Sequence, residues 1–282
     1  MSTLREKRKK ERRALRRRKT ADWTVVLILC AIAVCCGGYL IYHHWSVKQR
    51  ELEYEKLRQE ETLSAATETV IAEPETEEST EETVIYCDPV YDFGQLHEQN
   101  EDIYAWIVVP GTQVDYPLLQ SGTDNYYLDY NLDHSKGYPG CIYTNQCNRK
   151  DFSDYNTVLY GHNMKNGSMF GSIHSFEDET FFDGHPYIYV YTENERLTYE
   201  IYEAAKFTDV YIPSGYVISS KDDRDQFLAD VREKVSDNKL HVREDMQIGE
   251  EDRLITLSTC VSGERRHRYL VIGGLVETAV YR

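Results

Sequence analysis

Residues 23–42 form a run of twenty residues without a charge, WTVVLILCAIAVCCGGYLIY. A helix rises about 1.5 Å per residue, so this is the length that crosses the hydrocarbon core of a bilayer. Aromatic side chains mark both ends of the run, as they do at membrane interfaces: Trp23 opens it, and Tyr39, Tyr42 and Trp45 lie at or just after its end. A cleaved signal peptide is the alternative, but the run is long for one and no A-x-A site follows. We therefore expect an uncleaved transmembrane signal anchor.

The charge of the chain divides on either side of this run. Residues 1–20 carry eleven Lys or Arg against two Glu, a formal +9, although the whole chain has a net charge of −16. The positive-inside rule then places the basic tail, residues 1–22, in the cytoplasm and residues 46–282 outside the cell membrane. A basic tail alone could bind nucleic acid. Because an apolar run adjoins it, a role in setting the orientation of the chain in the membrane is favoured. We expect no nucleic-acid partner.

The outer part divides into a linker and a folded domain. Residues 43–86 comprise a charged helix over 46–63 and a Glu- and Thr-rich segment, 64–83, that is predicted to be a disordered acidic stalk. Near Tyr86, Tyr, Ile and Val become frequent. Residues 87–282 are long enough for one domain with its own core.

Short strands dominate that domain. Eight runs rich in β-branched and aromatic residues are bounded by turn-forming residues, and one amphipathic helix is predicted over Lys221–Val235, capped by Ser219 or Ser220. A shorter helix is predicted within Gly167–Phe176. The pattern predicts a mainly β fold with few helices, a closed or nearly closed barrel. The predicted strands are Trp106–Val109, Val114–Leu119, Cys141–Thr144, Thr157–Tyr160, Tyr187–Tyr191, Leu197–Phe207, Leu254–Cys260 and Tyr269–Val276.

One cysteine stands at the end of a predicted strand. In the run from Leu254 to Cys260, the two-residue period of a strand puts Thr256, Ser258 and Cys260 on one face. A thiol on a small, polar face suits the floor of a cleft, although a lone cysteine is more often a buried structural residue.

Two further residues could activate such a thiol. His162 follows an apolar strand directly, after Gly161, whose missing side chain permits close backbone approach. An imidazole there could favour the reactive thiolate and later protonate a leaving amine. Arg268 opens the last strand, eight residues after Cys260, where a guanidinium could stabilise an oxyanion. Residue chemistry alone does not choose between Arg268 and its neighbours Arg265 and Arg266.

The order His, Cys, Arg resembles the sortases, cysteine transpeptidases of Gram-positive cell surfaces. Thr256–Cys260 reads TLSTC, the nucleophile motif of that family, and Arg268 heads its R-x-x-V strand, which selects Arg268 among the three arginines. The resemblance extends over residues 91–278 and is specifically to class B, whose long inserted helix matches 221–235. The segments similar to class B are Ala105–Leu119 (AWIVVPGTQVDYPLL), Asp124–Leu128 (DNYYL) and Asn156–Phe170 (NTVLYGHNMKNGSMF).

The resemblance implies an eight-stranded sortase barrel and a transpeptidation. Its substrates would be secreted proteins with a C-terminal sorting signal of the NPxTN or a similar PxT type, cut after Thr through a thioester on Cys260. A peptidoglycan amine would then take the acyl group. Arg268 and a backbone N–H, that of Val261, would hold the oxyanion while His162 protonates the leaving amine. Asn125, Leu128, Ser258 and Thr259 would line the substrate groove or lie near the thiol, and no metal or organic cofactor would be needed.

Some features depart from the family pattern or leave alternatives open. Ser262 stands where some class B members have an Asp two residues after the nucleophile, and Asn145 replaces a common Asp. Cys141 and Cys147 could form a disulfide or remain free thiols, whereas Cys260 is expected to be free.

A pilin polymerase that uses a Lys of another subunit is one alternative function. A non-catalytic surface-binding module is another, against which the intact His162, Cys260 and Arg268 argue.

Overall fold

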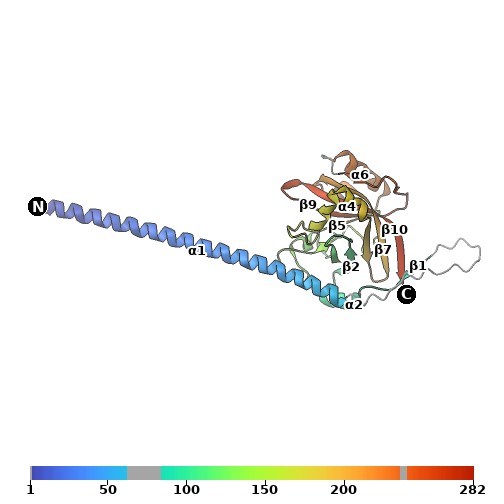
Figure 1. The fold of residues 1–282 in the computed structure, drawn as a ribbon, viewed down its shortest axis with the longest axis horizontal. Helices are drawn as coiled ribbons and strands as arrows, with labels where there is room; N and C mark the ends of the chain where they lie inside the picture. The colour runs from blue at the N-terminus through green and yellow to red at the C-terminus, as the bar shows by residue number, and fades with distance from the viewer. Residues whose placement is uncertain (1, 62–83, 236–239) are drawn as a thin grey trace, which may run out of the picture. The chain divides into compact units, whose positions relative to one another are not determined.

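The structure is a computed structural model of the chain and describes residues 2–61, 84–235 and 240–282. Its first element, α1 (Ser2–Glu61), is one unbroken helix of 60 residues (Figure 1). This helix contains both the predicted membrane run and the charged helix predicted to follow it. The predicted acidic stalk, 64–83, lies outside the described residues.

Within α1, the stretch Trp23–Gln59 includes a segment apolar enough to cross a membrane. Its large apolar side chains are exposed, for example Leu27 at 62% and Ile41 at 74%, as a lipid-facing surface requires. The helix fits a single-pass membrane anchor. The chain divides into two compact units between Glu53 and Tyr54, so the last turns of α1 belong to the same unit as the strands.

Eight strands close into a ring, which confirms the predicted barrel. The pairing order is β10, β9, β5, β4, β3, β2, β6 and β7, and β7 pairs back with β10. The eight predicted strands are the eight of this ring. Two short strands, β1 and β8, add to β10 and β7. The bounds are β1 Ile85–Cys87, β2 Ile103–Val108, β3 Asp115–Leu119, β4 Ile142–Tyr143, β5 Asn156–Tyr160, β6 Tyr187–Tyr191, β7 Glu195–Thr208, β8 His241–Val242, β9 Leu254–Val261 and β10 Glu264–Tyr281.

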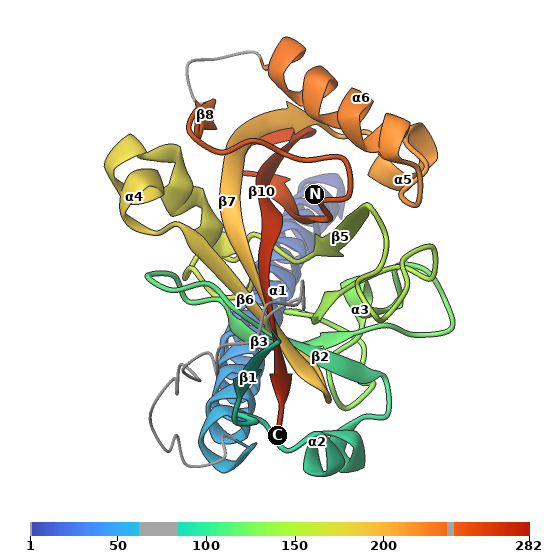
Figure 2. The same ribbon diagram turned by 90° about the vertical axis from the view of Figure 1, so that its right-hand side faces the viewer.

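Short helices connect and cover the strands. In Figure 2, α6 and β8 lie at one end of the long strands β7 and β10, and α2 lies at the other end, near the C-terminus. The predicted helix over 221–235 is confirmed as α6, whose N-cap Ser220 accepts a hydrogen bond from the Asp223 amide. The predicted helix over 167–176 corresponds in part to the 3₁₀ helix η1. The bounds are α2 Phe93–Gln99, α3 Tyr126–Asp129, η1 Gly171–Glu177, α4 Glu179–Gly184, α5 Ile212–Gly215 and α6 Lys221–Glu233.

Alternate residues of β9 and β10 enter two different apolar cores. Ile255 and Leu257 belong to the larger cluster, whereas Leu254 joins Phe227 and Val231 of α6 in the smaller one. Burying each of those two α6 side chains contributes about 2 kcal/mol. The strand period therefore puts the Cys260 side of β9 on the face covered by the smaller cluster.

Candidate active site

Cys260 lies near the end of β9, beyond the part of the strand that the smaller apolar cluster covers. Thr256 and Ser258, on the same strand face, are 0% and 4% exposed, whereas Cys260 is exposed. The predicted face is thus buried along its length and opens only at its last residue. A thiol in this position is accessible to a substrate while its strand is fixed on both sides.

Arg268 lies directly opposite Cys260 in the antiparallel ladder between β9 and β10. Residues opposed in this way present their side chains on the same face of the sheet. The Arg268 guanidinium is half-buried, and its Nη1 donates to the carbonyl of His267 at 3.0 Å. Arg265 and Arg266 are exposed and fall within an irregular stretch of the β9–β10 register. Of the three arginines, only Arg268 is paired with the cysteine.

His162 stands two residues beyond the end of β5, at the level of Cys260. The parallel ladder matches Tyr160 with Ser258, and the Gly161 amide donates to the Ser258 carbonyl at 3.3 Å. A Cβ on Gly161 would lie 2.5 Å from Ile142 and 2.8 Å from Phe170, which confirms the close approach predicted for this glycine.

The His162 ring is held by the loop after α3. Its Nε2 lies 2.8 Å from the Leu128 carbonyl, and its ring centroid lies 4.8 Å from that of Tyr138. Because a carbonyl only accepts hydrogen bonds, Nε2 carries a proton, and Nδ1 is the nitrogen left to exchange one.

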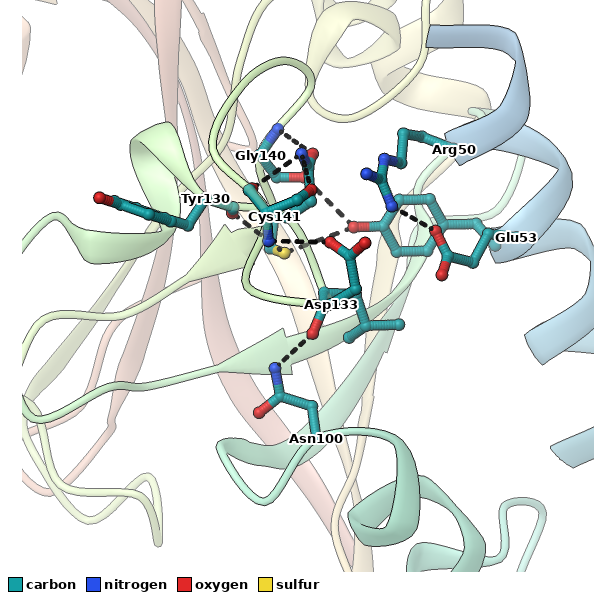
Figure 3. Close-up of polar contacts among 11 residues, drawn as sticks. Arg50, Glu53, Asn100, Tyr130, Asp133, Gly140 and Cys141 are labelled. Atoms are coloured by element: carbon teal, nitrogen blue, oxygen red, sulfur yellow. Dashed lines mark hydrogen bonds and ion pairs between the residues drawn. The ribbon is translucent and has the colours of Figure 1, made fainter. Parts of the chain in front are cut away.

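The loop that carries both neighbours of His162 is tied down from several sides (Figure 3). Its residues reach from the end of α3 to Cys141, next to β4. Polar groups outside it, including one from the last turns of α1, bond to its backbone. From outside the loop, the Tyr54 hydroxyl donates to the Gly140 carbonyl at 3.2 Å and Asn100 Nδ2 donates to the Leu132 carbonyl at 2.7 Å. Within the loop, the Gly140 amide donates to Asn131 Oδ1 at 3.1 Å.

Asn125, predicted to line the substrate groove, is the centre of a polar cluster. It adopts a left-handed backbone, φ 58°, at the start of α3, and its amide donates to Asn145 Oδ1 at 2.7 Å. Its Oδ1 accepts from the Tyr143 hydroxyl at 3.1 Å. Asn145 in turn donates to the Tyr211 hydroxyl at 2.8 Å. In the sequence, Asn145 stands out only as a departure from the family pattern, and no sequence signal marks Tyr143 or Tyr211 as part of the site.

The tyrosine hydroxyls in and beside this cluster are protonated at neutral pH. Burial raises the pKa of Tyr211 to about 12 and raises the pKa values of Tyr143 and Tyr160 further. Tyr143 and Tyr160 lie 5.6 Å apart between ring centroids, and Tyr160 and Tyr211 lie 6.1 Å apart. Together they form an aromatic wall beside Asn125.

The other predicted groove residues differ in exposure. Leu128 is 39% exposed, but Ser258 and Thr259 are buried. The Thr259 hydroxyl donates to the Gly161 carbonyl at 2.8 Å, so this side chain ties β9 to β5. Val261 is half-buried and pairs with Glu264 across the hairpin turn.

Cys260 is a free thiol, as the sequence predicts. Cys141 is buried, and its Sγ lies 3.6 Å from the Tyr130 carbonyl. Cys147 is exposed, with its Sγ 3.9 Å from the Tyr211 hydroxyl. Of the two possibilities for Cys141 and Cys147, this structure contains the one in which no disulfide joins them.

A pocket of about 640 Å³ opens beside Cys260. Its wall includes Asn163, His174, Glu177 and Glu264. Among the described residues, no group of three or more His, Cys, Asp or Glu side chains could hold a metal ion. The chemistry that this arrangement supports directly is that of a thiol, an imidazole and a guanidinium.

Comparison with known proteins identifies the family. The sortase domain model matches residues 107–276, which is more than half of the chain. The chain belongs to the sortase family. Sortase B of Listeria monocytogenes is 33% identical over 186 residues, which cover 64% of this chain and 72% of the relative. Sortases are cysteine transpeptidases, and the thiol, imidazole and guanidinium described above are the side chains that such chemistry uses.

Solved structures place the chain among the class B sortases. That of Clostridium perfringens sortase B has a TM-score of 0.59 and 29% identity, covering 66% of this chain and all of that one. A Streptococcus pyogenes class B sortase involved in pilus biogenesis has a TM-score of 0.56 and 26% identity, covering 65% and 97%. The class B resemblance seen in the sequence is therefore confirmed.

Proposed function

We propose that this class B sortase cleaves a C-terminal sorting signal of the NPxTN or a similar PxT type after Thr and joins the protein to a peptidoglycan amine. The observation that carries the proposal is the opposed pair Cys260 and Arg268 at the exposed end of β9, with His162 at the same level beyond β5. These are the three groups that acyl transfer through a thioester needs.

In the first half-reaction, the Cys260 thiolate attacks the carbonyl carbon of the signal's Thr. The oxygen becomes negatively charged, and the Arg268 guanidinium stabilises it with planar N–H donors. As the C–N bond breaks, the His162 imidazolium gives its proton to the departing nitrogen. The products are a thioester on Cys260 and a peptide with a new amino terminus.

In the second half-reaction, a neutral amine attacks the thioester carbonyl. The neutral His162 imidazole takes the amine's proton, and the thiolate of Cys260 leaves. The new amide joins the protein to the wall, and the enzyme regains its thiolate and imidazolium. Asn125 and Leu128, at the edge of the polar cluster, contact the signal in this scheme.

The membrane topology is part of the same proposal. The eleven basic residues before the apolar run favour an N-terminus in the cytoplasm and a catalytic domain outside, residues 87–282. A single-pass anchor in that orientation holds the enzyme where secreted proteins and cell-wall precursors meet.

The test is to incubate the full chain in detergent micelles with a panel of sorting peptides, with and without triglycine. Mass spectrometry of the Cys260 peptide should show an acyl adduct that triglycine releases as a new amide. A Cys260→Ala chain is the control and should give neither product. An adduct confined to another cysteine, or no adduct with any NPxTN or PxT peptide, would contradict the proposal.

A pilin polymerase is the second candidate, because the Streptococcus pyogenes class B sortase of similar fold is involved in pilus biogenesis. The two candidates differ in the amine that resolves the thioester. Adding peptides with a free Lys ε-amine to the same assay separates them: faster release by the lysyl peptide than by triglycine favours the polymerase.

A further inference from the structure

The carbonyl of Cys260 has an unusual set of partners. The β5–β9 ladder ends with Tyr160 and Ser258, and in a continued parallel ladder the backbone amide of Asn163 would be the next donor, to Cys260. The Asn163 backbone instead forms an isolated bridge with Met169. The Asn163 side chain makes this hydrogen bond in place of the backbone amide: Nδ2 donates to the Cys260 carbonyl at 2.8 Å. A side-chain amide thus replaces one rung of the ladder beside the nucleophile.

A histidine from η1 reaches the same point. His174 Nε2 lies 3.0 Å from the Cys260 carbonyl and 3.0 Å from Asn163 Nδ2. Its Nδ1 lies 2.7 Å from Glu177 Oε1, and its ring stacks on Tyr269 at a centroid distance of 4.9 Å. The imidazole is therefore fixed at both nitrogens and on one face.

This arrangement holds the carbonyl in either protonation state of the histidine. With a proton on Nδ1 only, Glu177 accepts it, Nε2 accepts from Asn163, and the other Asn163 N–H goes to the carbonyl. With both nitrogens protonated, Nε2–H can donate to the carbonyl itself. In both protonation states, at least one N–H group donates to the Cys260 carbonyl oxygen.

The hairpin after Cys260 has an irregular register, which makes this contact important for the alignment of Cys260 with Arg268. Between the pair Val261–Glu264 and the pair Cys260–Arg268, β9 advances by one residue while β10 advances by four. The turn alone therefore does not determine where Arg268 stands. Pairing with Phe207 of β7 holds Arg268, so contacts at the end of β9 are needed to hold the other member of the pair, Cys260.

We propose that Asn163, oriented by His174 and Glu177, is a positioning residue that fixes the Cys260 peptide and so keeps the thiol opposite Arg268. The proposal rests on the proposed function only in taking Cys260 as the nucleophile. The three residues do not touch the reacting atoms and act through the backbone of Cys260.

The test compares Asn163→Leu, His174→Leu and His174→Gln with the parent in full chains held in detergent micelles. His97→Leu is the matched control, because His97 Nε2 also contacts a backbone carbonyl, that of Ile103 at 2.8 Å, outside the pocket beside Cys260. Two measurements are made on each chain: alkylation of Cys260 by iodoacetamide from pH 5 to pH 10, read by mass spectrometry, and cleavage of the sorting peptide.

We expect Asn163→Leu to lower kcat about 10- to 100-fold while KM changes less than about threefold, since misplacement of reacting groups affects mainly the chemical step. The rate at which iodoacetamide alkylates its Cys260 should also fall about threefold or more, as the thiol loses its fixed place beside Arg268. His174→Leu should change kcat and the alkylation of Cys260 in the same direction but less. His174→Gln, whose side-chain amide can still form hydrogen bonds, should lie between His174→Leu and the parent. His97→Leu should match the parent.

Unchanged kcat and an unchanged alkylation profile in Asn163→Leu would overturn the proposal, as would equal effects from His97→Leu. Thermal unfolding of each chain separates positioning from loss of fold, and a kcat loss that merely follows a lower melting temperature also counts against it. Alkylation needs no sorting peptide. If the parent cleaves no peptide, the proposed function fails while the alkylation profiles still decide this inference.

Discussion

Cys260 and Arg268 face each other as a directly opposed pair across the β9–β10 ladder. Because the Ser258 and Cys260 carbonyls both point toward the β5 side, the Cys260–Arg268 pair is of the non-hydrogen-bonded kind, in which the two Cα atoms approach to about 4.5 Å. The sheet therefore sets the two Cα positions, from which the thiol and the guanidinium extend on the same face.

Replacing Cys260 by Ala should abolish thioester formation and lower peptide cleavage by about 10⁴-fold or more. Because Cys260 is exposed, the free energy of unfolding should change by no more than about 0.5 kcal/mol. Cys147→Ala, at another exposed thiol, is the control and should retain activity in the same assay. Full cleavage by Cys260→Ala would show that another nucleophile is used.

Arg268→Lys should lower kcat by about 10²- to 10³-fold, because a lysine ammonium lacks the planar fork that holds an oxyanion. Arg266→Lys is the matched control at an exposed position two residues away and should leave kcat unchanged. Steady-state kinetics with a fluorogenic sorting peptide measures both. Loss of activity in the Arg266 variant with normal activity in the Arg268 variant would mean that the paired arginine is not the one used.

Asn125→Gly should weaken substrate binding while sparing the chemical step. Glycine accepts the left-handed backbone of this position, so the change removes the side-chain hydrogen bonds without adding strain. We expect KM to rise about 5- to 20-fold, the equivalent of about 1–2 kcal/mol, with kcat within about threefold. An unchanged KM would remove Asn125 from the substrate groove.

Glu203 should make the stability of the domain depend on pH. Its carboxyl is 0% exposed, receives one hydrogen bond from Arg232 of α6 at 3.1 Å, and has its pKa raised by burial to about 7. The folded state therefore favours the protonated form. The stability that this proton supplies is present below the unfolded pKa of about 4.3 and is lost as the pH rises through 7.

Glu203→Gln removes this titration and should flatten the fall in unfolding free energy between pH 5 and pH 8, by an amount of the order of 2–3 kcal/mol. Chemical denaturation at four pH values, followed by near-ultraviolet circular dichroism, measures it. Glu98→Gln, an exposed carboxylate on α2, should keep the parent's profile. If the Glu203 variant lost stability with pH as steeply as the parent, the buried carboxyl would not be the cause.

The strands of the barrel were predictable because their β-branched and aromatic runs are local signals. Which strands pair with which was not predictable, since the ladder between β7 and β10 joins residues about sixty or more positions apart, such as Phe207 and Arg268. The helix α2 was missed because seven residues carry little periodicity, although Asp92, which caps it, was a readable sign.

The site was predictable to the extent that its residues stand in motifs. Cys260 and His162 lie at or just beyond the ends of strands. Arg268, predicted to open the last strand, lies four residues inside β10, and the ladders bring the three residues together. Asn163 follows His162 in the sequence, yet its contact with the Cys260 carbonyl depends on β5 turning away at that residue. Tyr211 lies far from Asn145 in the sequence, so only the fold reveals that pair.

The closure of the ring by β7 and β10 also limits how such an enzyme can be re-engineered. Arg268 is paired on one side with Cys260 and on the other with Phe207, so sliding β10 by one residue would break two ladders at once. Libraries aimed at new sorting signals should leave the strands alone. They should vary segments near the site that do not belong to the ring: 121–139, 209–217 and 262–263.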